Sequence, residues 1–186
     1  YAPDGTRHFR QERGVASEPH PETLPESYLT ARYIHLPGIP PDHCLIWINS
    51  LFERPLSKEH VSVDTFETFV KEGPELTKVV LNQAGLIFLN EEELRLLREY
   101  GEVSFSVPII LKRGPIGAVY IDGETSIAVP APQNIEVVDP TGAGDILAGV
   151  FLALRAQNIP IEKALQKAVN TASYSVTNFG VDHISL

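Results

Sequence analysis

From Ala31 onward, short apolar runs alternate with segments of helical character, and this alternation limits the fold more than any other feature of the sequence. Strands are predicted over residues 33–36, 61–66, 86–89 and 107–111, and each leads toward a helical or turn segment. We therefore expect an α/β fold of three layers, a mostly parallel sheet with helices on both faces. Ligands of such sheets bind beyond the carboxyl ends of the strands.

Residues that favour helix ends indicate where several helices begin. Asp42 is expected to cap a helix that runs to about Phe52, and Asn90 is expected to cap the helix that carries Leu94, Leu96 and Leu97. Proline favours the first turn of a helix, so Pro74 marks the start of another helix, which we expect to end near residue 83.

The C-terminal half adds a hairpin and two longer helices. Residues 118–121 are expected to pair with residues 126–129 through a turn at Asp122-Gly123. The helices are predicted over about 144–157 and 161–178, and Gly180 closes the second.

The N-terminal stretch differs from the rest of the chain. Residues 1–29 are rich in Pro, Glu, His and Ser, and we expect strand ends and loops there, with a short hairpin around Asp4-Gly5. The 186 residues are within the range of one domain. The chain starts at Tyr1 and contains no methionine, so we expect it to be a piece of a longer protein.

Charge and cysteine content exclude several classes of partner. The formal net charge is −9 and no run is rich in Lys or Arg, which argues against nucleic acid or an anionic membrane as partner. No apolar stretch approaches the length of a membrane span. Cys44 is the one cysteine, so it forms no internal disulfide; we expect a buried side chain and a reducing, cytoplasmic location. Oligomeric state is left open, a homodimer included.

The segment most informative about function is Asp139-Pro-Thr-Gly-Ala-Gly-Asp145. It lies between an apolar run at Ile135, Val137 and Val138, read as a strand, and a strongly helical segment. A strand that turns through small residues into a helix directs unpaired backbone N–H groups and the positive end of the helix dipole at one point, which suits a phosphate.

Within this turn, Gly142 and Gly144 leave room for close approach of an anion. Asp145 then lies in the first helical turn, beside the bound charge, where a carboxylate is a candidate general base. Phosphoryl transfer to a hydroxyl is the leading interpretation. The alternative for Asp145 is an acidic residue that only complements the helix dipole.

Three further features have both a functional and a structural interpretation. The run Glu91, Glu92 and Glu93 suits a solvated first helical turn, but a carboxylate there also suits Mg²⁺ held through water. A turn with Gly114 and Gly117 is either an ordinary strand connection or a nucleotide contact. The six histidines lack the spacing of metal ligands, and His35 is expected to be a satisfied core histidine.

Residues 137–145, Val-Val-Asp-Pro-Thr-Gly-Ala-Gly-Asp, resemble the signature of the ribokinase family, also called the PfkB family of sugar and nucleoside kinases. Asn90-Glu-Glu-Glu93 is similar to the family's Asn-x-x-Glu pattern after a strand. Lys112-Arg-Gly-Pro-Ile-Gly117 occupies the place of its nucleotide-side Gly-x-x-Gly turn. The order and spacing of the three agree with the family. The resemblance covers about residues 33–180, the C-terminal part of a typical member, and implies that the N-terminal part of the ribokinase-like fold is absent.

The resemblance implies an ATP-dependent and Mg²⁺-dependent kinase whose acceptor is a sugar, a nucleoside or a related small molecule. Asp145 would be the general base, and Gly142, Ala143 and Gly144 would form the anion hole. Asn90 and Glu93 would order the magnesium and phosphate region, Glu93 through water.

Other positions are implied to contact the nucleotide or an ion. Gly114 and Gly117 would lie beside the nucleotide, with Lys112 on the same side of the turn. Asp139 and Thr141 match positions that help to bind a monovalent cation in some members. Asn170 would lie near the adenine.

Two positions depart from the family pattern. Lys112 stands where the family often has Thr or Ser, which puts the usual hydroxyl contact to a nucleotide phosphate in doubt. Ile146-Leu147 replaces the small residue and Phe that often follow the final Asp, which we interpret as a change in packing.

The sequence leaves one alternative function open and disfavours another. The chain alone would also be consistent with a non-catalytic nucleotide-binding fragment or regulatory relic of this family. A dinucleotide-binding oxidoreductase is disfavoured, because Gly-x-Gly-x-x-Gly is absent and Asp145 would repel a pyrophosphate.

Overall fold

The computed structural model describes residues 14, 18, 20–54, 56–180 and 183–184. The hairpin expected around Asp4-Gly5 lies outside these residues. Residues 20–29 were expected as strand ends and loops, but they contribute to two short 3₁₀ helices, η2 (Pro21–Thr23) and η3 (Glu26–Thr30). Proline at the start of η2 and just before η3 suits the backbone of a helical turn.

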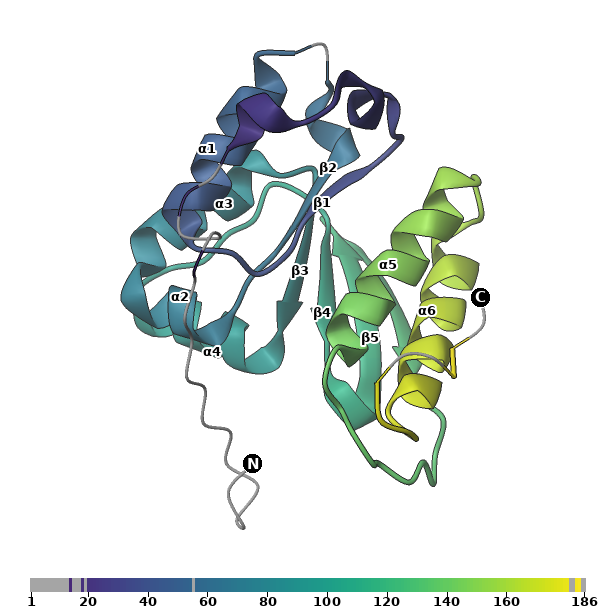
Figure 1. Cartoon of the computed structure of the whole chain (residues 1–186). Coiled ribbons are helices and arrows are strands. Elements are labelled where there is room, and N and C mark those ends of the chain that lie inside the picture. Colours follow the sequence, from purple (N-terminus) through teal and green to yellow (C-terminus); the bar gives the residue numbers. More distant parts are fainter. Residues whose placement is uncertain (1–13, 15–17, 19, 55, 181–182, 185–186) are drawn as a thin grey trace.

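One sheet of six strands forms the centre of the described structure (Figure 1). Strands β1–β4 are parallel to one another, whereas β5 and β6 are antiparallel to their neighbours, and the order in the sheet follows the sequence. The mostly parallel sheet and the hairpin through Asp122-Gly123 are therefore confirmed. The strands are β1 (Ile34–Leu36), β2 (Val61–Asp64), β3 (Leu86–Asn90), β4 (Ile109–Lys112), β5 (Gly117–Asp122) and β6 (Thr125–Pro130).

Helices cover both faces of this sheet, which confirms the predicted three layers. Figure 1 shows one group of helices on one side of the sheet and a second group on the other. The first group is α1 (Pro41–Phe52), α2 (Glu67–Glu72), α3 (Pro74–Gln83) and α4 (Glu91–Glu99). The second group is α5 (Ala143–Ala156) and α6 (Ile161–Ser175), and the short 3₁₀ helices η4 (Lys58–His60) and η5 (Gly114–Ile116) connect other elements.

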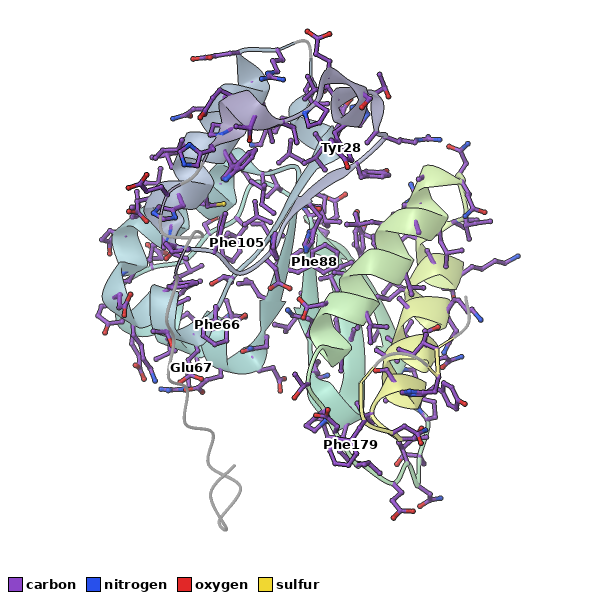
Figure 2. All side chains as sticks on the ribbon, in the orientation of Figure 1. Tyr28, Phe66, Glu67, Phe88, Phe105 and Phe179 are labelled. Atoms are coloured by element: carbon purple, nitrogen blue, oxygen red, sulfur yellow. The ribbon has the colours of Figure 1, made fainter. Side chains whose placement is uncertain are left out.

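The two faces of the sheet bury separate apolar clusters, because successive side chains of a strand point to opposite faces. In β3, Ile87 and Leu89 pack toward α1–α4, while Leu86 and Phe88 pack toward α5 and α6. Phe88 lies between the sheet and α5 (Figure 2), with its ring centre 6.3 Å from that of Phe151. This double burial explains why β3 reads as a continuous apolar run.

Several element boundaries differ from the sequence-based expectation. The N-cap of α1 is Pro40, and Asp42 lies inside the first turn. The predicted strand at residues 61–66 ends at Asp64, and Phe66 instead precedes α2, a helix that the sequence analysis did not anticipate. Helix α6 ends at Ser175, before the predicted residue 178.

Two other expectations concern burial and length. Cys44 is buried in α1, as predicted, and burial raises the pKa of its thiol to about 12. Its sulfur is therefore protonated at neutral pH and packs as a small apolar group. Within the part of the chain that the structure describes, no helix combines the length and apolarity required to span a bilayer.

Candidate active site

The turn before α5 has the geometry of an anion-binding site. Gly142 is the N-cap residue of α5 and has φ +78°, in the left-handed region that favours glycine. Among the described residues, no acceptor is bonded to the backbone N–H groups of Gly142, Gly144 or Asp145. The N–H of Ala143 reaches only the Pro140 carbonyl, at 3.4 Å. Free amides at the start of a 14-residue helix form a site of positive potential.

Asp145 occupies the third position of α5, and its carboxylate is exposed. It takes part in no hydrogen bond or ion pair within the described structure. An unpaired carboxylate next to unpaired amides is able to accept a proton from a hydroxyl while the amides hold an anion.

The segment that leads into this turn is not the strand predicted from Ile135, Val137 and Val138. The structure has irregular backbone there, and Val137 and Val138 are both exposed. The N–H groups of Val138 and Asp139 bond to the Val176 carbonyl after α6, at 2.7 and 3.1 Å. The turn is thus attached to the end of α6 and not to a neighbouring strand.

Asn90 and Glu93 form a reciprocal cap at the carboxyl end of β3. The Asn90 side chain accepts from the Glu93 N–H at 2.8 Å, and the Glu93 carboxylate accepts from the Asn90 N–H at 2.8 Å. This confirms Asn90 as the cap of α4. Glu93 is 3% exposed, and burial raises the pKa of its carboxyl to about 7 although the nearby Lys112 ammonium lowers it.

The pH dependence of the free energy of unfolding tests whether the Glu93 carboxyl is buried in this way. Between about pH 4.5 and 7 the folded state holds a proton on Glu93 that the unfolded state has lost, so the free energy of unfolding should fall by about 3 kcal/mol as the pH rises. Glu93→Gln keeps an acceptor for the Asn90 N–H but does not titrate, so it should lack this fall. Urea unfolding in metal-free buffer at a series of pH values measures the difference.

The matched control is Glu91→Gln, which changes an exposed side chain in the same helical turn. Parallel stability curves for wild type and Glu93→Gln across this pH range would contradict the assignment.

The turn between β4 and β5 requires glycine at both predicted positions. Gly114 has φ +54° and faces open space, whereas Gly117 has φ +115° and packs directly against β6. A Cβ on Gly117 would lie 2.0 Å from the Val129 carbonyl oxygen. The Gly-x-x-Gly pattern therefore has a steric cause in addition to any contact with a ligand.

Lys112 joins this region to a residue that the sequence analysis did not single out. Its Nζ donates to both carboxylate oxygens of Asp64, at 2.8 and 2.5 Å, across the intervening strand β3. It also lies against the anion-binding turn, 3.4 Å from the position that a Cβ on Gly144 would take. A polar residue at the end of the alternating Val61, Ser62, Val63 run was the only sequence signal for Asp64.

His35 lies on β1, near the charges of Asp64 and Lys112. It was expected to be a core histidine with both ring nitrogens hydrogen-bonded, and this is only half correct. Its Nδ1 is 2.9 Å from the Ser62 hydroxyl, but its buried Nε2 has no hydrogen-bond partner. Burial lowers the pKa of His35, while the carboxylates of Asp64 and Asp145 raise it.

The remaining predicted residues are less closely connected to this cluster. Asp139 accepts from the Thr141 N–H at 3.0 Å and shapes the turn before Gly142. Asn170 is exposed on α6 and accepts a hydrogen bond from Gln166, one turn earlier in the same helix. No hydrogen bond joins Asn170 to the other predicted positions in the described structure.

The side chains that could bind a metal limit which cofactors fit this region. In the described ranges, no group of three or more His, Cys, Asp or Glu side chains is arranged to hold a metal ion. Mg²⁺ commonly keeps several waters and binds through one or two carboxylates together with substrate phosphates. The described side chains would therefore fit Mg²⁺ only where water and phosphate oxygens supply most of its ligands.

Comparison with known proteins identifies the family and the fold. Residues 61–185 match the model of the pfkB family carbohydrate kinases. A cytidine kinase of Thermococcus kodakarensis is 28% identical over 193 residues, which cover 97% of this chain and 68% of that kinase.

Solved structures share the fold. A nucleoside kinase of Methanocaldococcus jannaschii, an archaeal member of the ribokinase family, superposes with a TM-score of 0.70 at 22% identity, over 83% of this chain and 52% of that one. An Escherichia coli protein assigned as a ribokinase II, in complex with ATP and Mg²⁺, gives 0.69 at 22%, over 89% and 59%. The chain thus spans roughly half to two thirds of the length of these relatives. The family match covers most of the chain and includes the turn before α5, so the chain belongs to the pfkB family of carbohydrate kinases.

Proposed function

We propose that this protein is an ATP-dependent kinase that transfers the terminal phosphoryl group of ATP to a hydroxyl of a nucleoside or sugar. The observation that carries the proposal is the pairing of unbonded amides at Gly142, Gly144 and Asp145 with the exposed, unpaired Asp145 carboxylate. Family membership supports the reaction class, and the geometry of the turn supports the roles that we propose for its residues.

In the proposed reaction Asp145 accepts the proton of the acceptor hydroxyl as its oxygen forms a bond to the terminal phosphorus. The bond from that phosphorus to the bridging oxygen breaks, and ADP leaves. The turn at Gly142, Ala143 and Gly144 presents N–H donors to the phosphoryl oxygens, and the positive end of α5 stabilises their developing charge.

Other residues would hold the nucleotide. We assign Gly114 and Gly117 to the turn beside it and Lys112 to its phosphates, because Lys112 lies against Gly144. Asn90 orients Glu93, whose carboxylate approaches Mg²⁺ only through water, since it is buried in the cap. Mg²⁺ bound with ATP supplies charge neutralisation for the transferred group. We keep Asp139 and Thr141 as the monovalent cation positions and Asn170 as the residue near the adenine.

For the acceptor, a nucleoside is the first class to test. The cytidine kinase matches nearly the whole chain, and a nucleoside kinase shares its fold. A ribose 5′-hydroxyl and a free sugar hydroxyl present the same group to Asp145, so the base does not distinguish them.

The test is ADP release by the complete gene product with ATP, Mg²⁺ and a panel of nucleosides and sugars. We expect ADP release well above the rate without acceptor for at least one nucleoside or sugar. ATP binding without acceptor-dependent release would contradict the proposal and favour a non-catalytic nucleotide-binding protein. Absence of ATP binding would contradict both functions.

A further inference from the structure

The ion pair between Asp64 and Lys112 is built at the carboxyl ends of β2 and β4. Asp64 is almost fully buried, with its side chain 4% exposed, and the Lys112 side chain is 15% exposed. The Asp64 carboxylate also accepts from the Thr65 N–H at 2.8 Å, which fixes its orientation. A buried carboxylate with three donors is able to hold an ammonium group in one place.

The location of this ammonium is unusual because it lies at the positive end of a helix. Lys112 Nζ and Cδ lie 3.4 and 3.6 Å from the Cβ position of Gly144, the second residue of α5. A cation is unfavourable at a helix N-terminus, so Lys112 depends on Asp64 for its stability there. The ammonium thus lies close to the start of α5, where the unbonded amides are, and both kinds of group attract an anion.

The hydrogen-bond capacity of Lys112 points to the same ligand. An ammonium has three N–H donors, and Lys112 directs hydrogen bonds to the two oxygens of Asp64. The third donor has no acceptor among the described residues. A phosphate oxygen held by the amides of the turn would supply that acceptor without breaking the ion pair.

We propose that Asp64 is a positioning residue, which holds the Lys112 ammonium against the anion-binding turn so that the lysine and the amides bind the same terminal phosphate of the nucleotide. The proposal rests on the proposed kinase function. Lys112 stands where the family often has Thr or Ser, so the proposal gives the expected phosphate contact to the lysine instead of a hydroxyl. The supporting carboxylate, Asp64, comes from another strand, β2. The ammonium already lies at van der Waals distance from the position that a Cβ on Gly144 would take.

The test compares the affinities of the complete gene product for ATP and for AMP, which lacks the terminal phosphates. Lys112→Met should weaken ATP binding about 10- to 100-fold, the usual effect of losing a charge-assisted hydrogen bond, and leave AMP binding within about threefold. Lys78→Met is the matched control, because Lys78 has a 16% exposed side chain, pairs with Glu75 and lies on α3. The control should keep the wild-type ratio of the two affinities.

A double-mutant cycle tests the role of Asp64. If Asp64 acts through Lys112, then Asp64→Asn should change the ATP to AMP affinity ratio and kcat in the wild-type background. It should change neither in the Lys112→Met background. The double variant also removes both buried charges, so it guards against a result caused only by an unpaired charge in the fold.

The outcomes separate this inference from the proposed function. A wild-type protein that fails to bind ATP or to release ADP refutes the kinase function itself. A wild type that binds and turns over ATP, combined with an unchanged affinity ratio in Lys112→Met, overturns the inference alone. Effects of Asp64→Asn and Lys112→Met that simply multiply would also overturn it.

Discussion

Replacing Asp145 with asparagine should lower kcat of the complete gene product by about two to four powers of ten, the usual loss when a positioned base is removed. Asparagine has nearly the same shape but does not accept the proton of the acceptor hydroxyl. The amides of Gly142 and Gly144 belong to the backbone, so they remain in place. Affinity for ATP should therefore change little, and isothermal titration calorimetry together with ADP release separates the two effects.

A matched substitution shows whether a fall in kcat comes only from a less stable helix. Asp42 also lies in the first turn of a helix, α1, and is also exposed. Asp42→Asn removes the same favourable interaction with a helix dipole, worth about 0.3–1 kcal/mol, without touching the anion-binding turn. It should leave kcat unchanged. Near-normal turnover in Asp145→Asn would refute the assignment of the base.

Replacing Gly117 with alanine should destabilise the fold by about 3 kcal/mol or more. Backbone atoms of β6 and the residue after it lie where the new Cβ would go, and unlike a flexible side chain they cannot easily move away. The new Cβ would lie 2.0 Å from the Val129 carbonyl oxygen and 2.7 Å from the Ala131 nitrogen. The hairpin of β5 and β6 would have to shift, and with it the turn that follows Lys112. Urea unfolding monitored by circular dichroism measures the loss.

Gly114→Ala is the matched comparison for this substitution. Gly114 lies in the same turn with φ +54°, but its Cβ would meet nothing within 4 Å. Only the left-handed backbone opposes alanine there, at a cost of about 1–2 kcal/mol. If the two variants lose equal stability, the close packing of Gly117 against β6 is not the cause of its requirement for glycine.

Features that depend on neighbouring residues were predictable from the sequence. Asn90 was predicted as the cap of α4, and its side chain bonds to a backbone N–H only three residues away. The hairpin turn needs only Asp122-Gly123 between two apolar runs. These predictions were correct because short-range hydrogen bonds and backbone preferences decide such elements.

Two failures show where periodicity alone is insufficient. Val137 and Val138 have the apolar character of a strand, but the sheet already ends at β6, and their segment bonds to Val176 instead. Conversely, the sequence did not predict α2, which is six residues long and would have little stability as an isolated helix. Its Phe69 and Val70 are buried, so packing in the assembled structure stabilises it.

By itself the sequence determined the alternation of strands and helices, the family, and the glycine turn at residues 142–144 that precedes Asp145, because each depends on residues close together in the chain. The tertiary structure alone decided the contact of Asp64 with Lys112, 48 residues away, and the placement of both beside Gly144. That contact depends on the parallel order of β2, β3 and β4, which brings carboxyl ends of separate strands to one edge. Pairing between strands is a long-range interaction, and no local pattern of side chains specifies which polar residues it will bring together.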